Sequence, residues 1–324
     1  METIDSRFCY VSMSYGNTSG SSATTRPAVA GATLSGYMRE WVSRLRRLGR
    51  ARTAENYAAT LSSLLRFCGR EVDFEEFDHL LVEEYESHLK ARGNTPNTTS
   101  FYMRNLRAVY NRAAIAGLTV QRHPFRGVYT GVEKTLKRAL TLDELKRVCN
   151  LDLRLRPALG LARDLFIFSF LTRGMSFIDM AYLRKRDVAG GIMTYRRRKT
   201  GQLLYVKWEA DMQQIMEKYP PNPTDFLLPI IMRPDADFRA QYANAQRRTN
   251  AQLKQVAVMA GLRTPLSMYA ARHSWASVAK SINIPVSVIS EGMGHDSEAT
   301  TNIYLAALDT AVVDNANSKI IKLL

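Results

Sequence analysis

Hydrophobic side chains recur every three or four positions through the first third of the chain, starting at Leu34. Polar and charged residues fill the positions between them, and this spacing is typical of amphipathic helices. It predicts helices over residues 34–49, 53–69, 74–93 and 95–118. Thr53 is the expected N-cap of the second helix, Gly69 its stop, and Thr95 with its following proline the start of the fourth. Residues 33–118 are therefore expected to form a small all-α domain.

Two segments lack this periodicity. Residues 1–32 are rich in Ser, Thr, Gly and Ala, which predicts a flexible leader. Residues 119–137 carry Pro124, Gly127 and Gly131 among basic side chains, which is typical of a linker. We expect a second domain after it.

The second domain is expected to be mostly helical as well. Thr141 and Glu144 have the spacing of a capping box, and residues 156–174 are apolar enough for a buried helix. Two short β-like runs flank residues 199–202, which predicts a hairpin. Further helices are predicted near residues 212–219, 250–261, 267–282, 285–293 and 297–308. The fold class is thus mainly α with a small β-hairpin or sheet, and an apolar tail follows at residues 309–324.

The charge balance indicates a polyanionic partner. Lys and Arg total 45 against 30 for Asp and Glu, a formal net charge of +15. Such an excess attracts nucleic acid, the commonest large polyanion in the cytosol, although a basic, soluble protein with no such partner is the alternative. Arginines that lie off the apolar stripes of the first domain suit contacts with a phosphate backbone, although a solvated helix face has the same pattern. They are Arg44, Arg46, Arg47, Arg50, Arg52, Arg104, Arg107 and Arg112.

Other features exclude several classes of protein. The cysteines, at positions 9, 68 and 149, do not have the spacing of metal ligands and are expected to be reduced. No stretch approaches the ~18 apolar residues of a membrane helix, and the N-terminus lacks the pattern of a signal peptide. We expect a cytoplasmic, nucleoid-associated protein with no membrane partner.

One predicted helix combines aromatic, cationic and imidazole side chains. Tyr269, Arg272 and His273 have i, i+3, i+4 spacing and share a helical face. Arg272 lies among apolar neighbours, so it needs an anionic partner. That partner is either a carboxylate, such as Glu291 or Asp179, or a phosphate oxygen gripped by the guanidinium fork.

Three residues elsewhere complete a set. Lys199 lies at the predicted hairpin turn, His295 precedes the last predicted helix, and Tyr304 lies within it. In this order, and with Arg272 between them, they resemble the active-site residues of the tyrosine recombinase (phage-type integrase) family. The segments that carry the resemblance are LTRGMSFIDMAYLRKRDV, YRRRKTGQLLYV, YAARHSWAS and GMGHDSEATTNIY.

The resemblance covers residues 34–308 and implies both a fold and a function. The fold is an N-terminal helical core-binding (SAM-like) domain followed by a catalytic domain at residues 138–308. The function is that of a small two-domain bacterial site-specific recombinase of a mobile element, for DNA integration, excision or inversion. The implied partners are double-stranded DNA with specific recombination sites and a homotetramer on two sites. Accessory DNA-bending proteins are left open, and residues 309–324 are the expected exchange element between subunits.

The same resemblance assigns roles to residues. Tyr304 is the nucleophile of a 3′-phosphotyrosyl intermediate, and its phenol, with an ordinary pKa near 10, needs assistance. Arg272 and His295 offer fixed donors to the charge that develops on the phosphate oxygens. Lys199 is the general acid for the departing 5′ oxygen, and His273 has a supporting role. Because the phosphotyrosyl link keeps the bond energy, we expect no ATP. We also expect no other cofactor and no metal, because arginines can take the place of a metal and the sequence has no carboxylate cluster or His/Cys pattern suited to Mg²⁺ or Zn²⁺.

Two positions depart from the family pattern. Tyr269 stands where the family has the His of a His-x-x-Arg motif, and a phenol cannot act as an imidazolium. Counting back from Asp187, with Asp179 as the acidic residue, places Ser176 at the family's first arginine.

Two arginines are candidates for that missing function. Arg173 is favoured, because it interrupts an apolar helix with a charge and lies one helical turn before the vacant position. Its alternative interpretation is an ion pair with Asp179 or Asp164. Arg197 is the second candidate, because strand alternation puts it on the same face as Lys199. For Arg197, a contact with the DNA backbone or with solvent is the alternative.

Two other functions are compatible with these residues. Ser176 and Tyr269 raise the alternative of a catalytically inactive DNA-binding protein on the same scaffold. A type IB topoisomerase-like enzyme would use the same chemistry to relax supercoils without paired sites. Strand cleavage separates the first alternative from a recombinase, and the need for paired sites separates the second.

Overall fold

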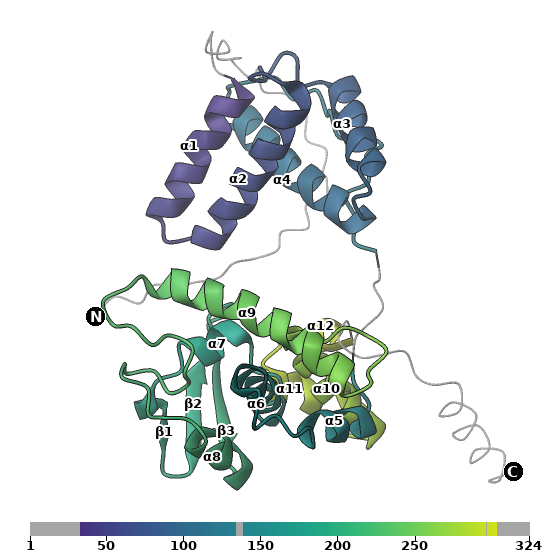
Figure 1. Cartoon of the computed structure of the whole chain (residues 1–324). Helices are drawn as coiled ribbons and strands as arrows, with labels where there is room; N and C mark the ends of the chain where they lie inside the picture. The colour runs from purple at the N-terminus through teal and green to yellow at the C-terminus, as the bar shows by residue number, and fades with distance from the viewer. Residues whose placement is uncertain (1–32, 134–138, 296, 303–324) are drawn as a thin grey trace, which may run out of the picture. The chain divides into compact units, whose positions relative to one another are not determined.

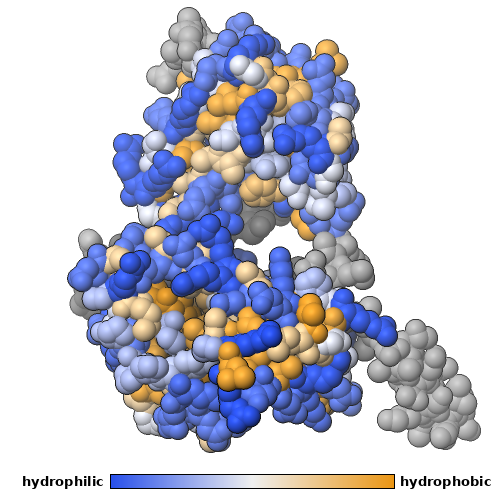
Figure 2. Space-filling model, in the orientation of Figure 1, coloured by the Kyte–Doolittle hydropathy of each residue, from blue (hydrophilic) through white to orange (hydrophobic). Residues whose placement is uncertain are grey.

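The computed structural model describes residues 33–133, 139–295 and 297–302 (Figure 1). The chain forms two compact units, divided between Lys134 and Thr135, each with its own hydrophobic core. That division falls inside the segment expected as a linker. Figure 2 shows mostly hydrophilic side chains on the visible surface of each unit, with smaller hydrophobic patches between them. The expected leader and exchange tail lie outside the described residues.

Unit 1 is a small all-α unit. Its helices are α1 (Leu34–Arg47), α2 (Ala51–Cys68), α3 (His79–Ala91) and α4 (Pro96–Ile115). Their apolar stripes meet in one core, in which Met38, Leu64 and Tyr110 are fully buried. As expected, Thr95 caps α4 ahead of its first-turn proline, and Gly69 ends α2 in the left-handed conformation.

Two predicted helix starts in unit 1 are wrong. α2 begins two residues before Thr53, which lies in its first turn. The alanine and arginine that precede Thr53 are good helix formers, so the helix extends past the threonine. α3 begins at His79 rather than at residue 74. Asp78 accepts a hydrogen bond from Leu81 N (2.9 Å) and caps the helix at that point.

The first part of the expected linker belongs to the core of unit 1. Phe125 and Val128 are buried there, and the Phe125 ring lies 5.8 Å from the ring of Phe77. Burying one such side chain stabilises a fold by about 1.5–3 kcal/mol. Hydrophobic spacing gives no signal here, because two isolated side chains contact the core instead of a helical stripe.

Unit 2 is built around α6 (Pro157–Leu171), the predicted buried helix, which packs against α9 (Phe238–Met259) and α10 (Met268–Ser281). The other helices are α5 (Leu142–Cys149), α7 (Phe177–Ala181), α8 (Ala210–Glu217), α11 (Val286–Met293) and α12 (Glu298–Asn302). An antiparallel sheet in sequence order consists of β1 (Val188–Ala189), β2 (Ile192–Arg196) and β3 (Leu203–Lys207), preceded by a short 3-10 helix, Lys185–Asp187. Figure 1 shows the sheet and α8 at one end of this unit, α10, α11 and α12 at the other, and α9 spanning both.

The capping box and the hairpin of unit 2 are confirmed, whereas α9 is longer than predicted. Thr141 and Glu144 exchange hydrogen bonds at the start of α5, and β2 and β3 flank the predicted turn. α9 begins at Phe238, capped by Asp237, rather than near residue 250. Its N-terminal half is polar, so hydrophobic spacing gives no signal there. In the described part of the chain, no helix combines the length and apolar character needed to cross a membrane.

A buried charge cluster joins α6 to the end of α8. Asp164 is buried and pairs with Arg163 Nε (2.8 Å) and Lys218 Nζ (3.2 Å). Its Oδ2 also accepts a hydrogen bond from Tyr219 OH (2.8 Å). Asp164→Ala leaves these donors without their acceptor, so we expect the free energy of unfolding to fall by roughly 2–4 kcal/mol, measured by urea denaturation. The half-exposed Lys218 limits the loss, because water can solvate it.

The exposed pair of Asp152 and Arg154 is the matched control. Their side chains lie 2.7 Å apart, and both are open to solvent. Asp152→Ala should leave the urea midpoint almost unchanged, because solvent screens such a pair. Equal losses in the two variants would contradict the importance given to burial at Asp164.

Candidate active site

Arg272 lies on the buried side of α10 and is only 3% exposed. Its guanidinium donates to two backbone carbonyls, Gly174 O through Nη1 (2.8 Å) and Met293 O through Nη2 (2.6 Å). Both of these partners are neutral dipoles. They fix the direction of the guanidinium without cancelling its charge.

The turn after α6 makes room for this contact. Arg173 (φ +61°) and Gly174 (φ +75°) both have a left-handed backbone. A Cβ at Gly174 would lie 2.6 Å from Arg272 Cα, so only glycine fits. The helix therefore stops before Arg173, and Arg173 and Ser176 do not share the helical face that the sequence spacing predicts.

His295 connects Arg272 to α12. Its Nε2 lies 2.9 Å from Arg272 Nη2, and its Nδ1 lies 2.8 Å from Thr301 Oγ1. A guanidinium can only donate, so Nε2 accepts, the imidazole is neutral, and Nδ1–H donates to the threonine oxygen. Burial is the main reason that the pKa of His295 falls to about 4, and the positive charge of Arg272 is the next. Arg197 and Lys199 act in the same direction.

Arg197 reaches the same place from the sheet. It follows β2, is 7% exposed, and donates from Nη1 to Gly294 O. Gly294 ends α11 in the left-handed conformation (φ +64°), and a Cβ there would lie 3.1 Å from Arg197 Cδ. Arg197 and Arg272 therefore both bind carbonyls at the C-terminus of α11. The helix dipole places partial negative charge at that end.

Lys199 lies exposed at the hairpin turn, two residues beyond Arg197. The turn is closed by hydrogen bonds from Gly201 N to Arg197 O (2.7 Å) and from Arg197 N to Gln202 O (2.8 Å). Because its charge contributes to the lowered pKa of His295, Lys199 belongs to the same electrostatic cluster. Its exposure leaves the ammonium group accessible to a substrate.

Tyr269 has a different environment from Arg272, although both are on α10. It is 53% exposed, and its ring stacks edge-on against the buried His273, with centroids 5.0 Å apart and an interplanar angle of 84°. His273 therefore packs beside Tyr269 and fixes one side of its ring.

The two residues of the first-arginine region have separate surroundings. Arg173 packs against α11, with its Cδ 3.6 Å from the position of a Cβ on Gly292. Ser176 caps α7 and donates to Asp179 Oδ2 (2.6 Å). Both carboxylates considered as partners of Arg173 thus have other partners, Asp179 this serine and Asp164 the cluster described above.

Tyr304, the expected nucleophile, lies outside the described residues. It follows α12 in the sequence, and α12 carries Thr301, the partner of His295. The contacts of Gly174 and Thr301 with Arg272 and His295 were not expected from the sequence, although Thr301 and Gly294 lie within the segment GMGHDSEATTNIY. Among the residues that the structure describes, no three His, Cys, Asp or Glu side chains are grouped so that they could hold a metal ion.

The arginines expected to contact DNA in unit 1 are all exposed. Arg44 and Arg112 lie over the Trp41 ring, 5.5 and 4.4 Å from its centroid, so one indole holds guanidiniums from α1 and α4. Arg107 donates to Thr130 Oγ1 (2.8 Å). These contacts orient part of a basic surface that remains open to solvent.

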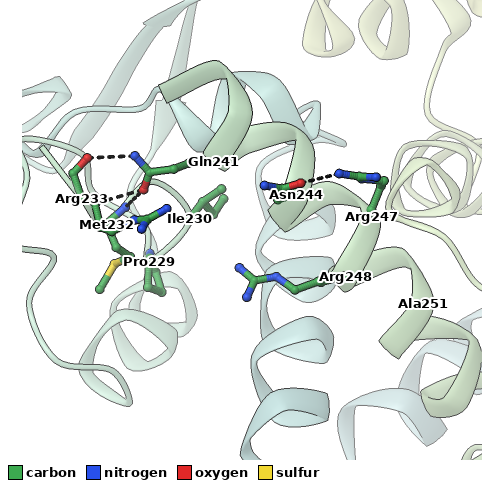
Figure 3. Close-up of a pocket in the computed structure, with 9 residues that line it drawn as sticks. All are labelled: Pro229, Ile230, Met232, Arg233, Gln241, Asn244, Arg247, Arg248 and Ala251. Carbon is green, nitrogen blue, oxygen red and sulfur yellow. Dashed lines mark hydrogen bonds between the residues drawn. The ribbon is translucent and has the colours of Figure 1, made fainter. Parts of the chain in front are cut away.

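A second basic surface, which was not expected from the sequence, lies along α9 (Figure 3). Arg233, Arg247 and Arg248 line a cavity of about 710 Å³ there. Gln241 holds the loop that forms one wall of the cavity through three hydrogen bonds. Its Oε1 accepts from the backbone N–H groups of Met232 and Arg233, and its Nε2 donates to Arg233 O. Arg248 extends toward the loop, and Arg247 donates to Asn244. The signal in the sequence, two adjacent arginines in QRRTN, falls in the half of α9 where no helix is predicted.

Known proteins share this architecture. Residues 33–129 match the sequence model of the phage integrase SAM-like domain. No protein of curated function matches the chain by sequence. A lambda integrase dimer bound to a COC′ core site is similar in structure, with a TM-score of 0.65 and 14% identity over 84% of this chain and 95% of that one.

Two further solved structures are similar to the same degree. A lambda integrase tetramer bound to a Holliday junction has a TM-score of 0.66 and 14% identity, over 86% of this chain and 78% of that one. The Tn1549 transposon integrase in complex with transposon right end DNA has a TM-score of 0.63 and 13% identity, over 90% and 99%. At these identities the likeness is one of fold. The chain therefore carries a phage integrase SAM-like domain at residues 33–129 and has the fold of the tyrosine recombinases, the phage-type integrases.

Proposed function

We propose that this chain is a site-specific DNA recombinase that cleaves and rejoins DNA strands through a 3′-phosphotyrosyl intermediate. The observation that carries the proposal is the cluster of Arg272, Arg197 and His295 around the C-terminus of α11. Thr301 joins this cluster to the helix that precedes Tyr304 in the sequence. The solved structures with the same fold are integrases bound to DNA, and a net charge of +15 suits such a partner.

The proposed reaction needs no external energy source. The phenol oxygen of Tyr304 bonds to the scissile phosphorus, the bond from phosphorus to the 5′ oxygen breaks, and one phosphodiester replaces another. Arg272 and Arg197 stabilise the charge that develops on the non-bridging oxygens. His295, which is neutral, accepts the phenol proton at Nε2, where it replaces the hydrogen bond from Arg272, and Lys199 donates a proton to the departing 5′ oxygen. The reverse steps, with a new 5′ hydroxyl, rejoin the strand.

Arg197, rather than Arg173, is the proposed substitute for the family's first arginine. Two observations support this choice: Arg197 is buried against Gly294, and its charge helps to lower the pKa of His295. Arg173 instead packs against α11. The preference for Arg173 from the sequence assumes a helix that continues to Ser176, and the left-handed turn interrupts it.

Double-stranded DNA with a specific site is the proposed substrate. The exposed arginines of unit 1 suit its phosphates, as do Arg233, Arg247 and Arg248 in unit 2. Lambda integrase, which has this fold, is a dimer on a core site and a tetramer on a Holliday junction. By analogy we propose a homotetramer on two sites, in which residues 309–324 connect neighbouring subunits.

Covalent capture tests the proposed nucleophile. Nicked duplexes with randomised flanks are incubated with the protein, and DNA that stays attached after denaturation is sequenced. We expect an adduct from the wild-type chain and none from Tyr304→Phe, because phenylalanine has no attacking oxygen. Tyr205→Phe, which removes an exposed phenol on β3, is the control and should keep the adduct.

Each negative result identifies a different function. A wild-type chain that binds DNA without forming an adduct would be an inactive DNA-binding protein of this fold. A chain that forms adducts and relaxes supercoils at single sites, but exchanges no strands between two sites, would be a topoisomerase-like enzyme.

The choice of first arginine has its own test. We expect Arg197→Ala to slow single-turnover cleavage by about 10²–10³-fold, which is typical for the loss of one preorganised donor. Arg173→Ala should slow it by less than about tenfold, because Arg173 packs against α11 at Gly292, whereas Arg272 and Arg197 are the arginines that donate to the carbonyls of Met293 and Gly294. Arg197→Lys keeps the charge without the fork and should recover part of the rate. The opposite ranking, with both variants folded by circular dichroism, would restore Arg173 to this role.

The neutral state of His295, which the proposed proton transfer requires, predicts a pH dependence of stability. Its folded-state pKa of about 4 lies below the ordinary value of 6.5, so the unfolded chain takes up the proton first as the pH falls. The stabilisation is complete at neutral pH and is lost as the pH falls from about 6.5 to 4. Between pH 7 and pH 5 the wild type should lose about 1–2 kcal/mol more than His295→Gln in urea denaturation. Identical losses would show that the pKa of His295 is not lowered.

A further inference from the structure

A small cavity lies beside Arg272, and its polar residues from α9 have no role in the reaction as described above. It measures about 170 Å³ and lies between the turn after α6 and the starts of α7 and α10, with one face of α9 as a further wall. From α9 come Tyr242, Gln246 and Asn250, whose i, i+4, i+8 spacing aligns them along that face. All of the lining residues lie in the described part of the chain. Arg272 is the one cation among them, and none is a carboxylate.

The amide of Asn250 has a fixed orientation. Its Oδ1 accepts a hydrogen bond from Met268 N (2.9 Å). A backbone N–H can only donate, so the oxygen of the amide faces Met268 and the NH₂ group is the other end. That NH₂ group donates to no protein acceptor within the described residues. Gln246, one turn earlier, accepts in the same way from Tyr242 OH (3.3 Å) through its Oε1.

The positions at which the chain departs from the family pattern line the same cavity. Ser176 is one of them, and its only hydroxyl proton is donated to Asp179 Oδ2 (2.6 Å). Tyr269 is the other, at the more exposed end of α10. Asn250 therefore offers an uncommitted donor next to Arg272, where Ser176 offers none.

We propose that Asn250, with Gln246 beside it, donates a hydrogen bond to a non-bridging oxygen of the phosphate that Arg272 binds. This rests on the proposed function, because it takes Arg272 as a phosphate ligand. A phosphate oxygen is the acceptor that suits a carboxylate-free cavity with amide donors and one guanidinium in its wall. An amide adds a donor without adding another cation to a cluster in which cations already repel one another.

Asn250→Asp removes this donor and adds a negative charge at the same place. The aspartate keeps an oxygen for Met268 N–H and replaces only the NH₂ group. Gln255→Glu introduces the same charge on the exposed face of α9 and is the matched control. Gln246→Glu is the second variant and provides the measurement if Asn250→Asp does not fold.

Binding without cleavage is the measurement. The probes are short duplexes selected from a randomised library by Tyr304→Phe, remade with a single methylphosphonate at each successive position. Affinities are compared for Tyr304→Phe alone and in combination with each α9 variant. On unmodified DNA we expect Asn250→Asp to weaken binding by about 10–100-fold, the range for one hydrogen bond to a charged acceptor, and Gln255→Glu by much less.

The proposal is tested by the methylphosphonate position at which the affinity difference between Asn250→Asp and its parent disappears. A methylphosphonate at the phosphate bound by Arg272 should shrink the difference between Asn250→Asp and its parent to about twofold, because the charged acceptor is gone. Equal affinities for Asn250→Asp and the control would overturn the proposal, as would a full difference at every methylphosphonate position. A difference that disappears only at an abasic position would show a contact with a base instead. Since no probe is cut, a chain that never forms a covalent adduct would refute the recombinase function and still report on this contact.

Discussion

Two buried guanidiniums held at one helix C-terminus determine the rest of the site. Arg272 and Arg197 come from segments far apart in the sequence, and the carbonyl oxygens of Met293 and Gly294 bring them together. Removing a charge from water is costly unless hydrogen bonds replace its hydration. Carbonyl dipoles supply those bonds and leave the charge intact, so the cations keep their attraction for a phosphate. This arrangement requires the backbone at Gly174 and Gly294 to lie close to the two arginine side chains. Both glycines have a left-handed backbone, and neither position has room for a side chain.

Features that depend on neighbours in the sequence could be predicted from it. The capping box of Thr141 and Glu144 and the start of α4 at Thr95 are examples, because a helix cap is set by residues within a few positions. The same holds for the hairpin turn around Lys199. His295 is selected from a motif of neighbouring residues, and the structure places it in direct contact with Arg272.

Features that depend on contacts between distant residues could not be predicted. The choice between Arg173 and Arg197 depends on the left-handed turn after α6 and on the approach of the hairpin to Gly294, and no local spacing encodes either. Phe125 packs in the core of unit 1 from a segment with the composition of a linker. The polar start of α9 is helical without an apolar stripe, so the sequence predicts no helix for Gln246 and the arginines that precede Asn250.

The carbonyl-held cations also make the proton affinity of the site depend on its substrate. Without DNA, His295 is neutral because it is buried and lies beside Arg272 and other cations. In the proposed reaction a phosphate brings negative charge to the same guanidiniums and opposes their effect on the imidazole. Transfer of the phenol proton to His295 is then more favourable after DNA binds than before. The empty site has little tendency to ionise its nucleophile, and the phosphate that is to be attacked is itself the group that raises the basicity of His295.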